Sequence, residues 1–231
     1  METSFWTKLL DVIAPRACVI CGSRLSPNED VLCARCHLHM PLTDLAASPL
    51  DNPMARLFWG LLPIERAAAW FYYYPKSDPC ALIYELKYHG QPELGRFMGE
   101  IAARRFAEFG FFEGIDAIVP VPITRRRQWQ RGYNQSMEIA RGVRDVTGLP
   151  IYNKVVKRTH FAGSQTQKNP WERLDNVEQS FQLVDGKLIE GLHLLIIDDV
   201  VTTGATIIAC GEKLATACDK ISVMSLGLTR D

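Results

Sequence analysis

An apolar run near residue 194 is followed by polar residues and then by a second apolar pattern with helical spacing. Residues 192–197 are almost continuously apolar, which is typical of a strand covered on both faces of a parallel sheet. Asp198 and Asp199 come next, and beyond residue 206 apolar positions recur every three or four residues up to Cys218. The pattern predicts a strand, a loop and a helix, with both carboxylates at the carboxyl end of the strand, where ligands bind in open α/β sheets.

The loop between this strand and helix has the composition of an anion-binding site. Gly204 lets the backbone approach a ligand closely, and Thr203 or Thr206 is predicted to cap the helix. The helix N-terminus adds N–H groups and the positive end of the helix dipole, so a phosphate fits here. A strand-terminal acidic pair that only caps a surface loop is the structural alternative.

The same periodicities predict the other elements of a parallel α/β sheet flanked by helices. Strands are expected over 66–74, 115–121, 151–157, 181–184 and 221–228, and helices over 5–13, 82–88, 92–109 and from Asn134 or Ser136 to Gly148. Residues 41–63 lack clear periodicity and indicate a linker or an irregular packing segment. Residues 158–176 are long and polar, as in a lid or a disordered loop. We expect residues 1–45 to form an N-terminal helix and a cysteine module, and residues 46–231 the α/β domain.

Charge changes this picture only locally. The chain has 26 basic and 26 acidic residues and a formal net charge of +0, so nothing global points to nucleic acid. One stretch is nevertheless basic: its only acids are Glu138 and Asp145, and its bases are Arg125, Arg126, Arg127, Arg131, Arg141, Arg144, Lys154, Lys157 and Arg158. Guanidinium groups there suit a pyrophosphate or a nucleic-acid backbone, although three consecutive arginines also occur in solvated turns. Lys87 either reaches a phosphate or lies on a solvated helix end.

Four of the seven cysteines form two C-x-x-C pairs, Cys18 with Cys21 and Cys33 with Cys36. Four thiolates at this spacing can surround one tetrahedral ion, and so short a segment has too little apolar surface to fold without it. The spacing therefore predicts a structural zinc site, while an iron–sulfur cluster would use the same thiolates. His37 and His39 are expected on the surface.

Two further features bear on location. The apolar runs are shorter than a bilayer span, and the first residues lack the basic start and the small-residue cleavage site of a signal peptide. We therefore expect a cytoplasmic protein without membrane insertion, whose cysteines are thiols or metal ligands rather than disulfides.

The stretch around the two aspartates resembles the phosphoribosyl-pyrophosphate (PRPP) motif of type I phosphoribosyltransferases. Four apolar residues, Asp198-Asp199, two apolar residues and Thr202-Thr203-Gly204-Ala205-Thr206 carry the resemblance. It implies that Asp198 and Asp199 contact the ribose hydroxyls as the catalytic carboxylates, that the loop wraps the 5-phosphate, and that Mg²⁺ accompanies PRPP. The implied PRPP-binding residues are Asp198, Asp199, Val200, Val201, Thr202, Thr203, Gly204, Ala205 and Thr206.

Other stretches narrow the resemblance to the ComF family of competence proteins, also described as GntX-like or amidophosphoribosyltransferase-like. These are the two cysteine pairs, Leu86-Lys87-Tyr88-His89-Gly90, Val119-Pro120-Val121-Pro122 and Arg131-Gly132-Tyr133-Asn134-Gln135. The family implies a type I phosphoribosyltransferase fold with an N-terminal zinc ribbon, and a flexible loop over about 158–176 that folds over PRPP. The implied pyrophosphate ligands are Lys87, Arg125, Arg126, Arg127, Arg131, Lys168 and Arg173.

The function implied by this resemblance is PRPP binding in a protein of DNA uptake, natural transformation or the use of external DNA. Two alternatives stay open: a catalytically silent module that senses PRPP or binds single-stranded DNA, and an active phosphoribosyltransferase of nucleotide metabolism, a glycosyltransferase by reaction class. The sequence leaves open whether the chain is an enzyme. The implied partners are PRPP, single-stranded DNA and a DNA-uptake helicase.

Overall fold

The computed structural model describes residues 16–75, 77–159 and 181–230. The helix expected over residues 5–13, most of the loop expected over 158–176, and with it Lys168 and Arg173, lie outside the described residues. The elements in chain order are α2 (Ala34–Leu38), η1 (Leu45–Ala47), η2 (Ala55–Leu57), β1 (Ile64–Tyr73), α3 (Cys80–Tyr88), α4 (Pro92–Ala107), β2 (Ala117–Pro120), α5 (Arg125–Arg131), α6 (Gln135–Thr147), β3 (Val156–Arg158), β4 (Phe181–Leu183), η3 (Lys187–Ile189), β5 (His193–Val201), α8 (Ala205–Leu214) and β6 (Lys220–Thr229).

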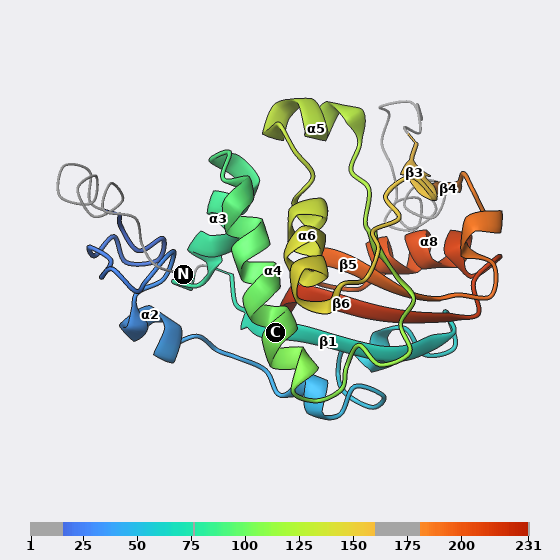
Figure 1. Cartoon of the computed structure of the whole chain (residues 1–231), viewed down its shortest axis with the longest axis horizontal. Helices are drawn as coiled ribbons and strands as arrows, with labels where there is room; N and C mark the ends of the chain where they lie inside the picture. Colours follow the sequence, from blue (N-terminus) through green and yellow to red (C-terminus); the bar gives the residue numbers. More distant parts are fainter. Residues whose placement is uncertain (1–15, 76, 160–180, 231) are drawn as a thin grey trace, which may run out of the picture.

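The core is a four-stranded parallel sheet in the order β1-β6-β5-β2. Strand β5 lies between two neighbours, and its residues 194–197 are fully buried, which explains their continuous apolar run. Parallel strands need crossover connections, and helices supply them (Figure 1). The predicted α/β fold with a parallel central sheet is therefore confirmed, and the carboxyl ends of β5 and β2 meet at one edge.

Helices α4 and α6 pack side by side in front of the sheet (Figure 1). Their backbones touch at a glycine, because a Cβ atom built on Gly142 would lie 2.0 Å from the carbonyl oxygen of Arg96. This close approach fixes α6, and the N-terminus of α6 lies at the edge where β2 and β5 end. Asn134 caps that terminus as predicted, since its side chain accepts a hydrogen bond from the Ser136 amide at 3.1 Å.

Three expectations are wrong in detail. Strand β5 continues through Asp198 and Asp199 to Val201 instead of ending before them. The stretch over 151–157 is no strand of the main sheet: Ile151 forms a single bridge to Ile118, and β3 pairs antiparallel with β4 in a separate sheet. The arginine loop contains helix α5, which has no buried residue, so no apolar periodicity could reveal it.

The cysteine module lies apart from the sheet, at the left of Figure 1. It joins the body through residues 41–43, which run along the edge strand β1: the amide of Tyr72 donates to the carbonyl of Pro41 at 2.8 Å, and the amide of Thr43 to that of Trp70 at 3.0 Å. Residues 45–62 then pack irregularly, with Met54 and Phe58 fully buried. None of the helices in the described ranges has the length and apolar character that a bilayer crossing requires.

Candidate functional site

Two adjacent carboxylates lie near the carboxyl end of β5 and hold different partners. Asp198 Oδ1 accepts hydrogen bonds from Ser136 Oγ at 3.0 Å and from the Asp199 amide at 2.9 Å. Asp199 Oδ1 accepts from the Val200 amide at 2.7 Å, and Asp199 Oδ2 lies 3.0 Å from Lys87 Nζ. Lys87 therefore reaches the acidic pair from the end of α3, and the alternative of a solvated helix end is wrong.

Burial decides the electrostatics of this pair. Removal from water, and then the neighbouring charge of Asp199, raise the pKa of Asp198 from 3.8 to about 7. Hydrogen bonds from the Asp199 amide and Ser136 and the charge of Lys87 oppose the shift without cancelling it. Asp198 is therefore only partly ionised near neutral pH in the free protein. A ligand that brings hydroxyl donors or a divalent cation would favour the ionised form.

The loop after β5 forms a small anion cradle. A cavity of about 50 Å³ is lined by Asp198 and residues 200–207. Gly204 has a φ of +79°, and a Cβ atom there would lie 2.9 Å from Phe58 Cε1, so both the conformation and the space require glycine. Gly204, which has no side chain, takes the N-cap position of α8, so neither threonine occupies it as predicted. Thr203 Oγ1 nevertheless accepts a hydrogen bond from the amide of Ala205, the first residue of the helix, at 3.5 Å. The amino end of α8 is therefore left to a ligand.

A second cavity of about 250 Å³ continues from the first and is rich in cationic groups. It is lined by Lys87, Tyr88, Val121, Ile123, Arg127, Arg131, Gln135, Ser136, Arg158, Asp198, Asp199, Val200 and Thr206. The structure thus brings three of the predicted pyrophosphate ligands, Lys87, Arg127 and Arg131, to the acidic pair. Arg125 and Arg126 also lie on α5, but they are exposed and do not line this cavity.

Three lining residues were missed by the sequence reasoning. Ser136 and Gln135 mark the start of α6, and their polar side chains give no sign that they face Asp198 and Arg131. Arg158 was counted with the basic stretch only. Its position on β3 puts it beside Arg127 and Asp198, and burial, followed by the charge of Arg127, lowers its pKa. Only the pairing of β3 with β4 could have placed it, and no local pattern encodes that pairing.

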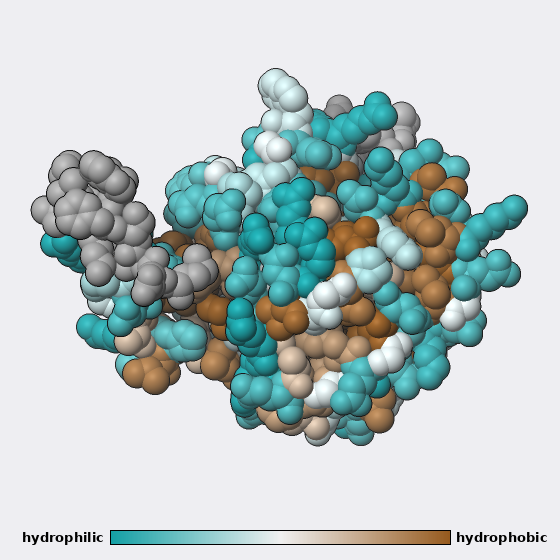
Figure 2. Space-filling view, viewed as in Figure 1, coloured by the Kyte–Doolittle hydropathy of each residue, from teal (hydrophilic) through white to brown (hydrophobic). Residues whose placement is uncertain are grey.

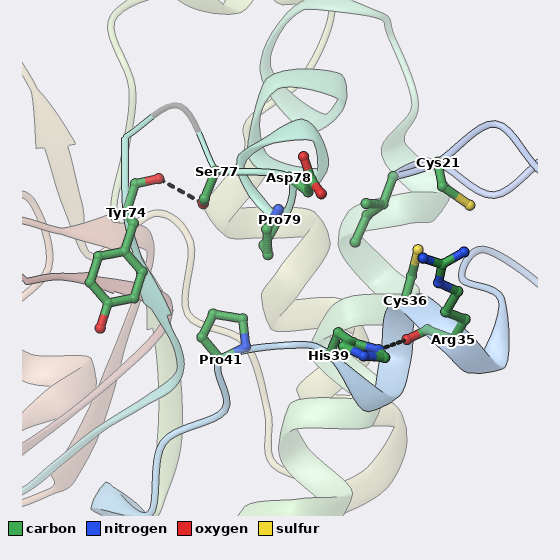
Figure 3. A pocket seen from close by; sticks show the side chains of 10 residues that line it. Cys21, Arg35, Cys36, His39, Pro41, Tyr74, Ser77, Asp78 and Pro79 are labelled. Atoms are coloured by element: carbon green, nitrogen blue, oxygen red, sulfur yellow. Dashed lines mark hydrogen bonds between the residues drawn. The ribbon is translucent and has the colours of Figure 1, made fainter.

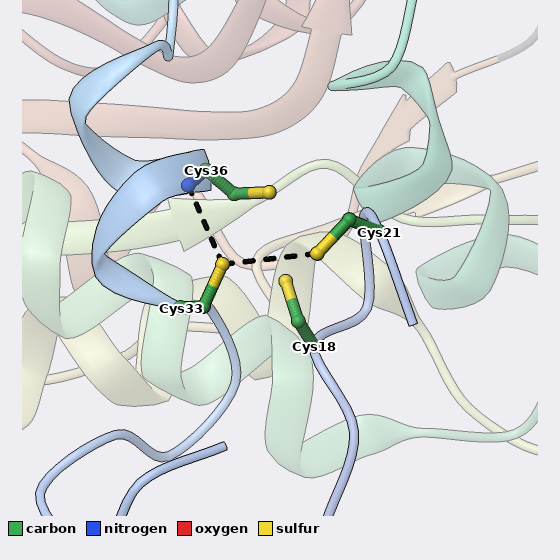
Figure 4. A group of neighbouring side chains, drawn as sticks. All are labelled: Cys18, Cys21, Cys33 and Cys36. Carbon is green, nitrogen blue, oxygen red and sulfur yellow. Dashed lines mark hydrogen bonds between the residues drawn. The ribbon is translucent and has the colours of Figure 1, made fainter. Parts of the chain in front are cut away.

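The four predicted cysteine ligands converge on one point (Figure 4). Their sulfur atoms all lie within 4.8 Å of one another, and Cys21 Sγ and Cys33 Sγ are 3.7 Å apart. Two sulfurs bound at about 2.3 Å to a tetrahedral ion are separated by about 3.8 Å, so the cluster fits zinc. Burial, and then hydrogen bonds with the neighbouring thiols, raise the pKa of Cys36. The four-cysteine metal site is confirmed as a site able to bind a metal ion.

A cavity of about 530 Å³ separates the cysteine module from the segment that leads into α3 (Figure 3). His39 lies on its wall with the ring turned toward the carbonyl oxygen of Arg35, 2.7 Å from Nδ1. His37 and His39 are both exposed, as predicted. Leu38 of α2 is 81% exposed, and Figure 2 shows apolar surface at the lower end of this module.

The relatives found by sequence comparison are named as DNA utilization or competence proteins. No protein-family model matches the chain. It is 28% identical over 200 residues to the DNA utilization protein YhgH of Escherichia coli K12, which covers 85% of this chain and 83% of the relative. It is 33% identical over 93 residues to competence protein F of Haemophilus influenzae, covering 40% of this chain and 41% of the relative. Competence protein ComFC of Bacillus subtilis is 27% identical over 113 residues, or 49% of this chain and 44% of ComFC.

Solved structures with a similar arrangement are phosphoribosyltransferases. The glutamine PRPP amidotransferase of B. subtilis has a TM-score of 0.40 and 17% identity, over 61% of this chain and 30% of that one. An adenine phosphoribosyltransferase has a TM-score of 0.35 and 18% identity, over 60% of this chain and 74% of that one.

Fold and site define an α/β protein with a ligand cleft at the carboxyl edge of its parallel sheet and a separate four-cysteine module. The chain is a homologue of the YhgH and ComF proteins, which confirms the resemblance to the ComF family.

Proposed function

We propose that the chain binds PRPP in the joined cavities at the end of β5. One observation carries the proposal: a carboxylate pair, half-buried at Asp198 and buried at Asp199, lies between the amino end of α8 on one side and Lys87, Arg127 and Arg131 on the other. PRPP has the matching order of groups, since its ribose hydroxyls lie between a monophosphate and a diphosphate. In this pose the α8 loop binds the 5-phosphate, and Asp198 and Asp199 accept hydrogen bonds from the ribose hydroxyls. The side chains of Lys87, Arg127 and Arg131 bind the pyrophosphate.

Magnesium fits the same donor set. Carboxylates and phosphate oxygens are the hard ligands that Mg²⁺ takes in nucleotide sites, and Asp198 and Asp199 would hold it together with PRPP. The ion would offset the charge of the pyrophosphate. The chain's own residues contribute positioning: Ser136 and the Asp199 amide orient the Asp198 carboxylate, and Lys87 must release Asp199 to bind phosphate.

Calorimetric titration tests this proposal. PRPP with Mg²⁺ should bind saturably to the wild type, and the double variant Asp198→Asn/Asp199→Asn should lose this binding because the hydroxyl acceptors lose their charge. Asp219→Asn, an exposed aspartate outside the cavity, should bind as the wild type does. Folded, metal-loaded wild type that binds no PRPP would mean that the loop is a retained scaffold.

A second candidate function is the binding of single-stranded DNA, and helix α5 supports it. This helix carries Arg125, Arg126 and Arg127, and its Trp129 is 87% exposed. Figure 2 shows hydrophilic and weakly polar residues over α5 at the top of the molecule. Arginines that bind phosphates, together with an aromatic ring on which a base can stack, are the features of single-strand binders. The relatives are named for DNA utilization or for competence, which supports a role of this chain in DNA uptake or use. A DNA-uptake helicase is the partner that this proposal implies.

Arg126→Glu should remove salt-sensitive binding of a single-stranded oligonucleotide, because each neutralised phosphate adds about 0.7 to the slope of log affinity against log salt. Trp129→Ala should weaken binding without changing this slope. Fluorescence titrations at several salt concentrations measure both effects. Arg104→Glu is the matched control: Arg104 is an exposed arginine of α4, on a helix that carries acidic residues as well. Binding that survives Arg126→Glu at low salt would exclude α5 as the DNA site.

A further inference from the structure

One buried polar group of the cleft has an unused hydrogen-bond donor. Gln135, the first residue of α6, is 1% exposed. Its Oε1 accepts a hydrogen bond from Arg131 Nη1 at 2.9 Å, whereas its Nε2 is buried and has no hydrogen-bond partner among the described residues. The contact with Arg131 fixes the orientation of the amide, because the flipped amide would place its NH₂ group against a guanidinium. A buried amide nitrogen without a partner is unfavourable, so a ligand that supplies an acceptor would stabilise it.

The surroundings of Gln135 indicate which ligand group would use this donor. Gln135 lines the larger cavity at the N-terminus of α6, a helix of 13 residues whose dipole favours an anion. Arg131 lies beside it, with its guanidinium 5.7 Å from the centre of the Tyr88 ring. Arg127 lines the same cavity. This side of the cavity, called the α6 wall below, therefore presents hydrogen-bond donors and positive charge. The acidic pair, by contrast, lies on β5.

We propose that Gln135 is a specificity-determining residue: its Nε2 donates a hydrogen bond to the diphosphate group of PRPP and so distinguishes PRPP from ribose 5-phosphate. This inference rests on the proposed function, since it assigns the diphosphate end of the same ligand to the α6 wall. The 5-phosphate end binds at the α8 loop and does not reach Gln135.

The test compares three probes by calorimetry, each with Mg²⁺: PRPP, ribose 5-phosphate and inorganic pyrophosphate. Gln135→Met removes the donor at similar volume, together with the acceptor of the Arg131 hydrogen bond. Gln135→Glu keeps an acceptor for Arg131 and replaces the donor with a carboxylate oxygen. Both variants should bind PRPP and pyrophosphate about tenfold more weakly or worse, the usual effect of losing a hydrogen bond to a charged group. Their affinity for ribose 5-phosphate should stay within about twofold of wild type. Gln182→Glu, at an exposed glutamine of β4, should change none of the three.

Other results separate the two proposals. Wild-type affinity for PRPP in both Gln135 variants, or an equal loss for PRPP and ribose 5-phosphate, overturns the role of Gln135 and leaves PRPP binding intact. A third result is possible: the wild type binds pyrophosphate but not PRPP, and Gln135→Glu loses the pyrophosphate binding. This result refutes the proposed function but supports a diphosphate site at the N-terminus of α6. A wild type that binds none of the probes overturns both.

Discussion

Asp198 and Asp199 are neighbouring acidic residues, but only one ammonium group, that of Lys87, lies beside the pair in the described part of the chain. The ammonium of Lys87 contacts Asp199, while Asp198 takes its hydrogen bonds from Ser136 and from the Asp199 amide. With a pKa of about 7 in the folded chain, Asp198 ionises at a cost to folding. A surface aspartate paired with a cation has the opposite effect. The site is therefore built for a ligand at the expense of the stability of the free protein.

Asp198→Asn should stabilise the ligand-free protein, and more so at pH 8 than at pH 5. The carboxyl titrates near 3.8 when unfolded and near 7 when folded, so the wild type loses stability as the pH rises between these values. The amide oxygen of the asparagine in this variant still accepts a hydrogen bond from the Ser136 hydroxyl, and the amide carries no charge. Since one pKa unit corresponds to about 1.4 kcal/mol, the expected gain at pH 8 is a few kcal/mol. Urea unfolding at both pH values measures it, with Asp219→Asn as the exposed control. An equal difference at pH 5 and pH 8 would contradict the assignment.

At the scale of elements, the β5–loop–α8 unit was the part most fully encoded in the sequence. Its strand is buried on both faces, and its helix shows regular apolar spacing, so both periodicities are strong. The helical stretches that became α3, α4 and α6 were predictable for the same reason. The cysteine site was predictable because ligand chemistry fixes the spacing of its residues.

Other elements could not be read from local patterns. Helix α5 buries nothing, and its sequence shows no apolar spacing. Strand β3 is three residues long and exists through its antiparallel pairing with β4, a strand far from it in the sequence. From the sequence, Lys87 could equally reach a phosphate or lie on a solvated helix end. The fold places it at the end of α3, beside Asp199. Gln135 and Ser136 acquire their partners only when α6 packs against the edge of the sheet. The missing information in each case is a long-range contact.

At the scale of the whole molecule, we expect the cysteine module and the α/β body to differ in stability. The α/β body has a large apolar core, whereas the cysteine module buries only a few apolar residues, among them Leu25, Leu32 and Met40. Residues 41–43 link the two by backbone hydrogen bonds to the edge strand β1. We expect a module with so little buried surface to depend on a bound metal ion for its fold, and the body to fold without one. This contrast predicts that the units respond separately to metal loss.

Cys33→Ser should lower the bound zinc from about one ion per chain toward zero, because a tetrahedral structural site needs all four ligands. Residues 16–40 should then become open to proteolysis, while the thermal transition of the α/β body shifts by only a few degrees. Metal analysis and limited proteolysis followed by mass spectrometry measure these outcomes. Cys80→Ser is the matched control, since Cys80 lies outside the cluster and its thiol donates to the Tyr74 carbonyl. Full metal content in Cys33→Ser would exclude the cluster as the binding site. Unfolding of the body together with the module would refute the domain boundary expected near residue 45.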